Sequence, residues 1–218
     1  MPTRTPLSRE RIHATALELA DEHGLAGLSM RSLATALGVE AMSLYHHVPG
    51  KDALLDGLVD AVFAEFHLPV VGEDWTEQMR ARSGSAREAM KRHRWAIGLM
   101  DSRRTPGPET LRHHDAVLGC LRAAGFSLEL AGHAAALLDA HLYGFVVQEV
   151  SLPFQDEGEL ADLGSEILTG LPEGELVHFR EYAVDRALQP GYDFGDEFGW
   201  GLELVLEGIA RRLAEEQA

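Results

Sequence analysis

Apolar residues recur along most of the chain at the spacing of one helical face. From Lys51 onward, Leu55, Val59, Val62 and Phe66 follow one another at intervals of four, three and four residues. This spacing places them on one side of a helix, where they can pack against a neighbour. No stretch of useful length alternates apolar and polar residues as a half-buried strand does. The pattern therefore predicts an all-α protein.

Capping residues and glycines divide the first part of the chain into short helices. Ser8 and Ser29 each precede a helical pattern and are good N-caps, because a serine hydroxyl accepts a hydrogen bond from a free backbone N–H of the first turn. Gly38 ends the second pattern. The predicted helices cover residues 8–24, 30–37, roughly 40–47, and a longer stretch from 51.

The rest of the chain reads as longer helices separated by proline- and glycine-rich breaks. Residues 68–74 and 103–108 are predicted loops, and the stretch 153–174 is loop-like with one helix. The predicted helices cover residues 75–83, 86–99, 109–124, 127–150, 175–187 and 196–216.

Residues 30–48 have the spacing of a helix-turn-helix. Counting Met30 as the first position, Ala34 is the fifth, Gly38 the ninth and Leu44 the fifteenth. A small residue at the fifth position lets the two helices approach closely, and the glycine gives the short turn its backbone freedom. The same hairpin also occurs in proteins that never touch DNA, so a protein-interaction adaptor is an alternative. The shared core is predicted to contain Leu33, Leu37, Val39 and Leu44.

Charge is distributed unevenly along the chain. The 35 acidic and 19 basic residues give a formal net charge of −16, and this whole deficit lies beyond Lys51 because the charges of residues 1–51 cancel. Such acidity argues at face value against a nucleic-acid partner. The shift in composition instead predicts two regions with different partners, which we place at residues 1–52 and 53–218.

Several classes of protein are disfavoured by the composition. Cys120 is the only cysteine, which excludes an intramolecular disulfide and any multi-cysteine metal site. The 11 histidines show no HExxH spacing, so no metal and no cofactor are expected, and no nucleophile–base pair indicates an enzyme. The N-terminus has no signal-peptide pattern and no apolar run approaches a membrane span, so a soluble, cytoplasmic protein without a membrane partner is expected.

Residues 8–66 resemble the N-terminal domain of TetR-type transcriptional regulators. The resemblance rests on the segments HGLAGLSMRSLA and LGVEAMSLYHHVPGKDALL. More weakly, HRWAIGLMDSRRTPGPETLRHHDAVLGCLRAAGFSLELA and FGDEFGWGLELVLEGIARRL resemble the C-terminal domain of the tetracycline-repressor branch. This resemblance implies an N-terminal three-helix DNA-binding domain and a larger helical domain for ligand binding and dimerisation. It also implies a homodimer formed by the long helix over residues 127–150 and the last helix.

The resemblance further implies a set of DNA-contacting residues. Arg31 is the best candidate base reader because a guanidinium can pair bidentately with guanine, and Ser43 can bond a base or a phosphate. Tyr45 and Lys51 are candidate phosphate contacts. The alternative is that Met42 or Tyr45 packs within the hairpin and that His46 is only solvated. The full set is Arg31, Ala41, Met42, Ser43, Tyr45, His46, His47 and Lys51.

Candidate ligand contacts are polar or aromatic residues on otherwise apolar helical faces. His67 falls at a position that touches ligand in the tetracycline-repressor branch. Asp101 and Gln148 stand where that branch has a histidine and an acidic residue, which disfavours a magnesium–tetracycline ligand and favours another, aromatic molecule. The candidate pocket residues are His67, Trp95, Met100, His141, Phe145 and Gln148.

Together these observations predict a ligand-responsive, homodimeric regulator, most simply a repressor that a small molecule releases from palindromic double-stranded operator DNA. The two rival functions are an adaptor whose hairpin binds another helix and, with less support, a small-molecule enzyme. A gel shift at low salt with the DNA upstream of the chain's own gene separates them, because an adaptor leaves the probe unshifted.

Overall fold

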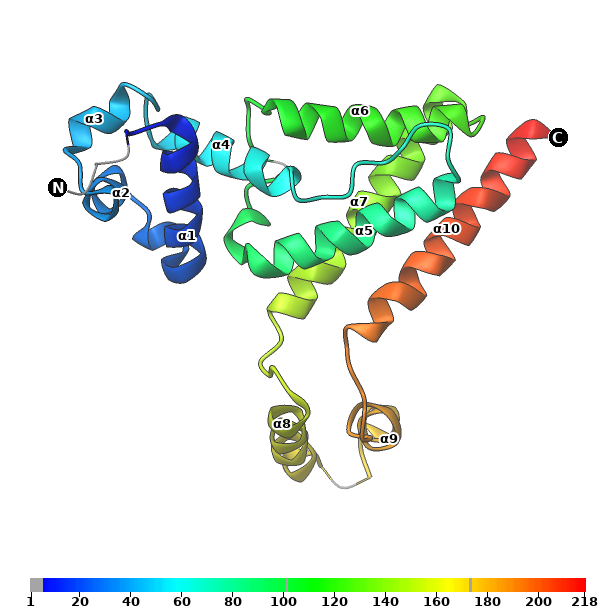
Figure 1. Cartoon of the computed structure of the whole chain (residues 1–218). Coiled ribbons are helices and arrows are strands. Elements are labelled where there is room, and N and C mark those ends of the chain that lie inside the picture. The colour runs from blue at the N-terminus through cyan, green and yellow to red at the C-terminus, as the bar shows by residue number, and fades with distance from the viewer. Residues whose placement is uncertain (1–5, 101, 173) are drawn as a thin grey trace.

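The computed structural model describes residues 6–100, 102–172 and 174–218, and within these residues the fold is helical without a strand. Figure 1 shows a small N-terminal group of helices joined through α4 to a larger C-terminal group. The predicted all-α class is therefore confirmed. The helices are α1 (Arg9–Gly27), α2 (Met30–Leu37), α3 (Ala41–Tyr45), α4 (Lys51–Phe63), α5 (Trp75–Arg92), α6 (Pro108–Ala123), α7 (Leu128–Val150), α8 (Glu157–Gly170), α9 (Val177–Tyr182) and α10 (Asp196–Gln217), with short turns η1 (Arg94–Ala96) and η2 (Ala183–Ala187).

Local sequence signals set the beginnings and ends of the first helices. The Ser8 hydroxyl accepts a hydrogen bond from the backbone N–H of Arg11, and Ser29 forms a reciprocal capping box with Ser32. The backbone of α1 leaves the helical region at Gly24, as its sequence predicts, although the helix is then resumed as far as Gly27. These predictions are confirmed because each depends on contacts within a few residues.

Gly38 ends α2 in the left-handed conformation, with φ 65° and ψ 38°. An L-residue with a Cβ is strained there by about 1–2 kcal/mol, of which the stiffer unfolded chain offsets part. Gly38→Ala is therefore expected to lower the free energy of unfolding by about 1 kcal/mol in denaturant titrations. Gly50→Ala is the control, because its φ of 167° is extended backbone and its Cβ would meet open space. Equal losses from both changes would contradict this account.

The predicted break near residues 83–86 is wrong, because α5 continues from Trp75 to Arg92. Serine and glycine are weak helix formers, but tertiary packing outweighs this small preference. Ser83 is fully buried, and Met79, Ala86 and Met90 lie in the core on the same helix. The helix predicted over residues 86–99 is the second half of α5. It ends at Arg92, and the chain then continues into η1.

Two hydrophobic cores meet along α4. Leu54 and Leu58 pack with the buried residues of α1, α2 and α3, whereas Val59 and Val62 pack with those of α5, α6, α7 and α10. The helix α4 thus packs in both cores and connects the N-terminal group of helices to the C-terminal group. The domain boundary at residues 52 and 53 stays a prediction.

The C-terminal domain is built around α7, which packs against α5, α6 and α10. The expectation that no apolar run approaches a membrane span is wrong for α7, which could cross a membrane by length and composition. Its buried residues, among them Ala134, Leu138 and Leu142, belong to the core of this domain. In contrast, α8, α9 and η2 contain no buried residue among those described and lie at one end of the molecule (Figure 1).

Candidate DNA-binding surface and ligand crevice

The short helix α3 has one buried and one exposed side. Leu44 is fully buried among the residues of α1, α2 and α4, and it fixes α3 in place. The opposite side leaves Met42 71% and Tyr45 44% exposed. Because Met42 is so accessible, packing within the hairpin does not explain this residue. The exposed side of α3 is therefore available to a partner.

The turn between α2 and α3 has the tight geometry that the residue spacing predicts. Ala34 is buried at the crossing of the two helices, and its carbonyl accepts a hydrogen bond from the backbone N–H of Val39 at 3.0 Å. A single helix on such a support matches the width of a DNA major groove.

The remaining predicted DNA contacts lie on α2, on α3, just after α3 and at the start of α4. Arg31, His46 and His47 are exposed, whereas Ala41 and Ser43 are half-buried. Lys51 is exposed at the first position of α4, and its Nζ donates to the carbonyl of Leu25 at 3.4 Å. The lysine thus stands beside free backbone N–H groups of a helix start, an arrangement that suits a phosphate. The DNA contacts of all these residues stay predictions.

A crevice of about 360 Å³ lies between the ends of α5 and α7, the start of α8 and the segment before α10. Its walls combine aromatic rings with charged groups. Sequence reasoning missed these residues, because the crevice is formed by segments far apart in the chain. They include Lys91, Arg94, Glu149, Phe154, Tyr192 and Phe194, which we call the crevice residues.

An ion-paired carboxylate forms one wall of the crevice. Glu149 accepts hydrogen bonds from Arg87 at 2.5 and 2.8 Å and lies 2.9 Å from Lys91. Burial alone raises the pKa of Glu149, but the hydrogen bonds from Arg87 and Lys91 outweigh it, so the pKa lies below its ordinary value. The Arg87 guanidinium also lies over the rings of Phe145 and Phe198, at 5.6 and 5.0 Å from their centroids. Glu149 is thus held ionised.

Two of the predicted ligand residues lie directly behind this crevice. Phe145 stacks on Phe194 with ring centroids 4.9 Å apart. His141 stacks on Phe198, and its Nε2 lies 3.2 Å from the Phe198 carbonyl. Phe145 and His141 support the crevice wall from behind but do not line the crevice.

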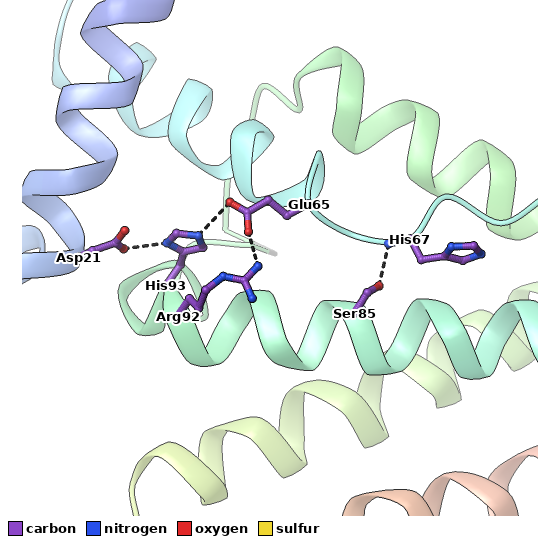
Figure 2. A network of polar contacts seen from close by, with 6 residues as sticks. All are labelled: Asp21, Glu65, His67, Ser85, Arg92 and His93. Atoms are coloured by element: carbon purple, nitrogen blue, oxygen red, sulfur yellow. Dashed lines mark hydrogen bonds and ion pairs between the residues drawn. The ribbon is translucent and has the colours of Figure 1, made fainter.

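The other predicted ligand residues are dispersed. The His67 backbone bonds to Ser85 (Figure 2), and its ring bonds to Gln78. Trp95 packs against the cores of both the N- and C-terminal domains. Met100 is buried in the core and Gln148 is exposed. The structure therefore does not bring the six together, and Asp101 lies outside the described residues.

A second polar group is buried in the middle of the C-terminal domain. Arg82 is 2% exposed, forms an ion pair with Asp139 and donates through Nε to His113 Nε2 at 3.4 Å. Burial, and then the positive charge of Arg82, lower the pKa of His113 to about 3, so this imidazole is neutral. In the described part of the chain, no three His, Cys, Asp or Glu side chains come together as a metal site.

Comparisons with known proteins agree with this architecture. Residues 12–58 match the model of bacterial regulatory proteins of the tetR family, and residues 68–213 match the tetracyclin repressor-like C-terminal domain. An HTH-type transcriptional regulator from Saccharopolyspora erythraea is 38% identical over 95% of this chain and 86% of its own length. The HTH-type transcriptional repressor DrrR1 from Streptomyces coeruleorubidus is 29% identical over 99% of this chain and 83% of its own length.

Solved structures give the same answer at the level of the fold. Apo ActR from Streptomyces coelicolor superposes with a TM-score of 0.80 at 30% identity, covering 97% of this chain and 99% of ActR. The complex of ActR with actinorhodin superposes with a TM-score of 0.79, covering 96% and 99%. The helix-turn-helix, the two cores and both family matches together show that the chain belongs to the tetR family of bacterial transcriptional regulators.

Proposed function

We propose that this chain is a homodimeric, cytoplasmic repressor that binds a palindromic operator and leaves it when a small molecule binds. The observation that carries the proposal is the accessible side of α3, where Met42 and Tyr45 are exposed while Leu44 anchors the helix. Dimers of such domains bind half-sites about one helical turn, or a multiple of it, apart.

In this proposal α3 enters the major groove and its neighbours contact the backbone. Arg31 and Ser43 face base edges, Ala41 and Met42 contact thymine methyl groups, and Tyr45 and Lys51 hold phosphates. His46 and His47, exposed at the end of α3, extend the same surface.

The effector in this proposal is an aromatic molecule that carries polar groups. A volume of about 360 Å³ is within the range of small-molecule sites. Phe154, Tyr192 and Phe194 offer aromatic surface, while Lys91 and Arg94 offer donors to an anionic or phenolic oxygen. ActR, which shares this fold, has been solved with actinorhodin and with (S)-DNPA, which supports a small-molecule effector for this chain.

Dimerisation is supported by large apolar side chains left exposed on α7 and α10. Leu137 and Val147 on α7 and Trp200 and Leu204 on α10 are between 47% and 67% exposed. Two copies packing through these helices would bury this surface.

An effector that moves operator occupancy from 99:1 to 1:99 must prefer the released state by about 5.5 kcal/mol.

The experiment is operator binding measured by fluorescence anisotropy with a labelled duplex from upstream of the chain's own gene. Lys51→Ala is expected to weaken binding to every duplex alike and to lower the salt slope by about one unit. Arg31→Ala is expected to cost about 1–3 kcal/mol on the preferred duplex and to relax base preference.

Three outcomes would count against the proposal. Equal losses on all sequences from both substitutions would remove the assigned roles. An unshifted duplex at low salt would favour the adaptor. Aromatic ligands that bind tightly without changing operator affinity would exclude the release mechanism.

A further inference from the structure

His93 lies between two carboxylates at the junction of the two domains. Its Nδ1 is 2.7 Å from Asp21 Oδ1, and its Nε2 is 3.0 Å from Glu65 Oε1 (Figure 2). Asp21 belongs to α1, Glu65 follows the end of α4, and His93 follows the end of α5. We call these three residues the His93 bridge.

The geometry of the His93 bridge requires two protons on the imidazole. A carboxylate oxygen only accepts, so each ring nitrogen that faces one must carry a hydrogen to bond it. A neutral imidazole would place one lone pair against a carboxylate oxygen. Because His93 is only 5% exposed, water does not easily replace the lost bond.

The groups around the bridge keep Glu65 ionised and bond Asp21. Arg92 of α5 bonds the second oxygen of Glu65 at 2.5 Å, and Trp95 Nε1 donates to the same Asp21 oxygen as His93 at 2.7 Å. Burial raises the pKa of Glu65, but the bonds from Arg92 and His93 outweigh it and lower the pKa overall. The charged groups facing His93 are thus Asp21 from α1 and Glu65 from the end of α4, with Arg92 beside it from α5.

The position of the bridge connects the DNA-binding surface to the C-terminal domain. α1 carries part of the N-terminal core, and α4 begins at Lys51, next to α3. Trp95 and Leu99, which follow His93, pack against both cores. A contact at this point therefore restricts how the N-terminal domain rotates on the C-terminal domain.

We propose that His93 is a positioning residue for operator binding, which fixes the orientation of the DNA-binding domain only while both of its ring nitrogens carry a proton. The inference rests on the proposed function, since orientation matters because two domains of a dimer must match two half-sites. A ring nitrogen without a hydrogen cannot donate to the carboxylate that it faces, so a neutral imidazole would lose one of the two bonds and operator affinity would fall.

The test compares variants across pH, using the duplex that the wild-type protein selects from a random pool. The dissociation constant of His93→Gln is expected to be about tenfold above wild type at pH 6, and the ratio is expected to fall as the pH rises. The ratio cancels any effect of pH that both proteins share. His23→Gln, an exposed change on α1, is the control and is expected to follow wild type.

Asp21→Asn tests the same bridge with His93 in place. An asparagine amide can donate to a neutral imidazole nitrogen, so operator affinity is expected to vary less with pH than in wild type. A His93→Gln ratio that stays constant with pH would indicate a purely structural role and would overturn the proposal. An Asp21→Asn profile equal to that of wild type would overturn it as well.

A readout without DNA keeps the inference separate from the proposed function. Nitrogen-15 NMR at pH 6 is expected to show both His93 ring nitrogens protonated with slowly exchanging hydrogens, and Asp21→Asn is expected to remove the slow exchange at one of them. If the wild-type protein selects no duplex, the proposed function fails while this spectrum still tests the bridge. Rapidly exchanging ring hydrogens in wild type would overturn the bridge itself.

Discussion

Asp139→Ala is expected to lower the free energy of unfolding by about 3–5 kcal/mol, because it leaves the guanidinium of Arg82 charged and unpaired in the core. Arg82 is 2% exposed, and its other side-chain partner, His113, is kept neutral by burial and by Arg82 itself. The Arg82 side chain is almost fully buried, so water solvates its guanidinium less well than the Asp139 carboxylate does. The lower free energy of unfolding therefore reflects an unpaired buried charge rather than the loss of one contact.

An exposed ion pair provides the comparison. Arg80 and Glu203 form two hydrogen bonds of 2.6 and 2.8 Å, but both side chains are 45–47% exposed. Glu203→Ala is expected to cost less than about 1 kcal/mol in the same denaturant titration, at the same protein concentration. The double variant Arg82→Met with Asp139→Leu is expected to regain most of the loss, since it removes the charge. Similar losses from Asp139→Ala and Glu203→Ala would contradict this explanation.

Features that depend on a few neighbouring residues were predictable from the sequence. The caps at Ser8 and Ser29 and the left-handed Gly38 follow from hydrogen bonds and sterics within one turn. The exposed side of α3 was also predictable, since the position of Leu44 in the helix-turn-helix decides which side is buried. These local signals were sufficient for the fold class and, together with the resemblance to TetR-type regulators, for the general function.

Features that depend on long-range pairing were not predictable. Arg82 reads as a solvated residue until Asp139 is placed beside it, and Glu149 gives no sign of Arg87 or Lys91. The continuity of α5 through Ser83 likewise depends on burial against other helices. The two members of each ion pair are separated by more than 50 residues in the chain. The crevice was therefore missed, although Phe145 and His141 behind it were identified.

The net charge of −16 is distributed in a way that is compatible with DNA binding. Several acidic residues along α4 are engaged with the C-terminal domain. Asp56 accepts from Arg103 at 2.5 Å, Asp60 accepts from the backbone N–H of Thr110 at 2.8 Å, and Glu65 belongs to the His93 bridge. The N-terminal segment itself is neutral, so long-range attraction to a duplex is weak and affinity depends on a few placed donors.

Leu204→Asp is expected to convert the proposed dimer to a monomer and to weaken operator binding by about 100-fold or more. Leu204 and Trp200 are spaced one turn apart on α10 and are 50% and 67% exposed. A two-fold interface contains each substitution twice, so two carboxylates would be buried without partners. A monomer binds each half-site alone. It loses the effective concentration that links the second half-site to the first, which raises the affinity of a dimer by about 10²–10⁴-fold.

Sedimentation velocity measures the first effect, and anisotropy with the selected duplex measures the second. Val71→Asp is the matched control, because Val71 is 58% exposed in the loop before α5 and belongs to neither α7 nor α10. It is expected to leave mass and affinity unchanged. If Leu204→Asp remains dimeric and binds the duplex as tightly as Val71→Asp, then α10 does not form the interface.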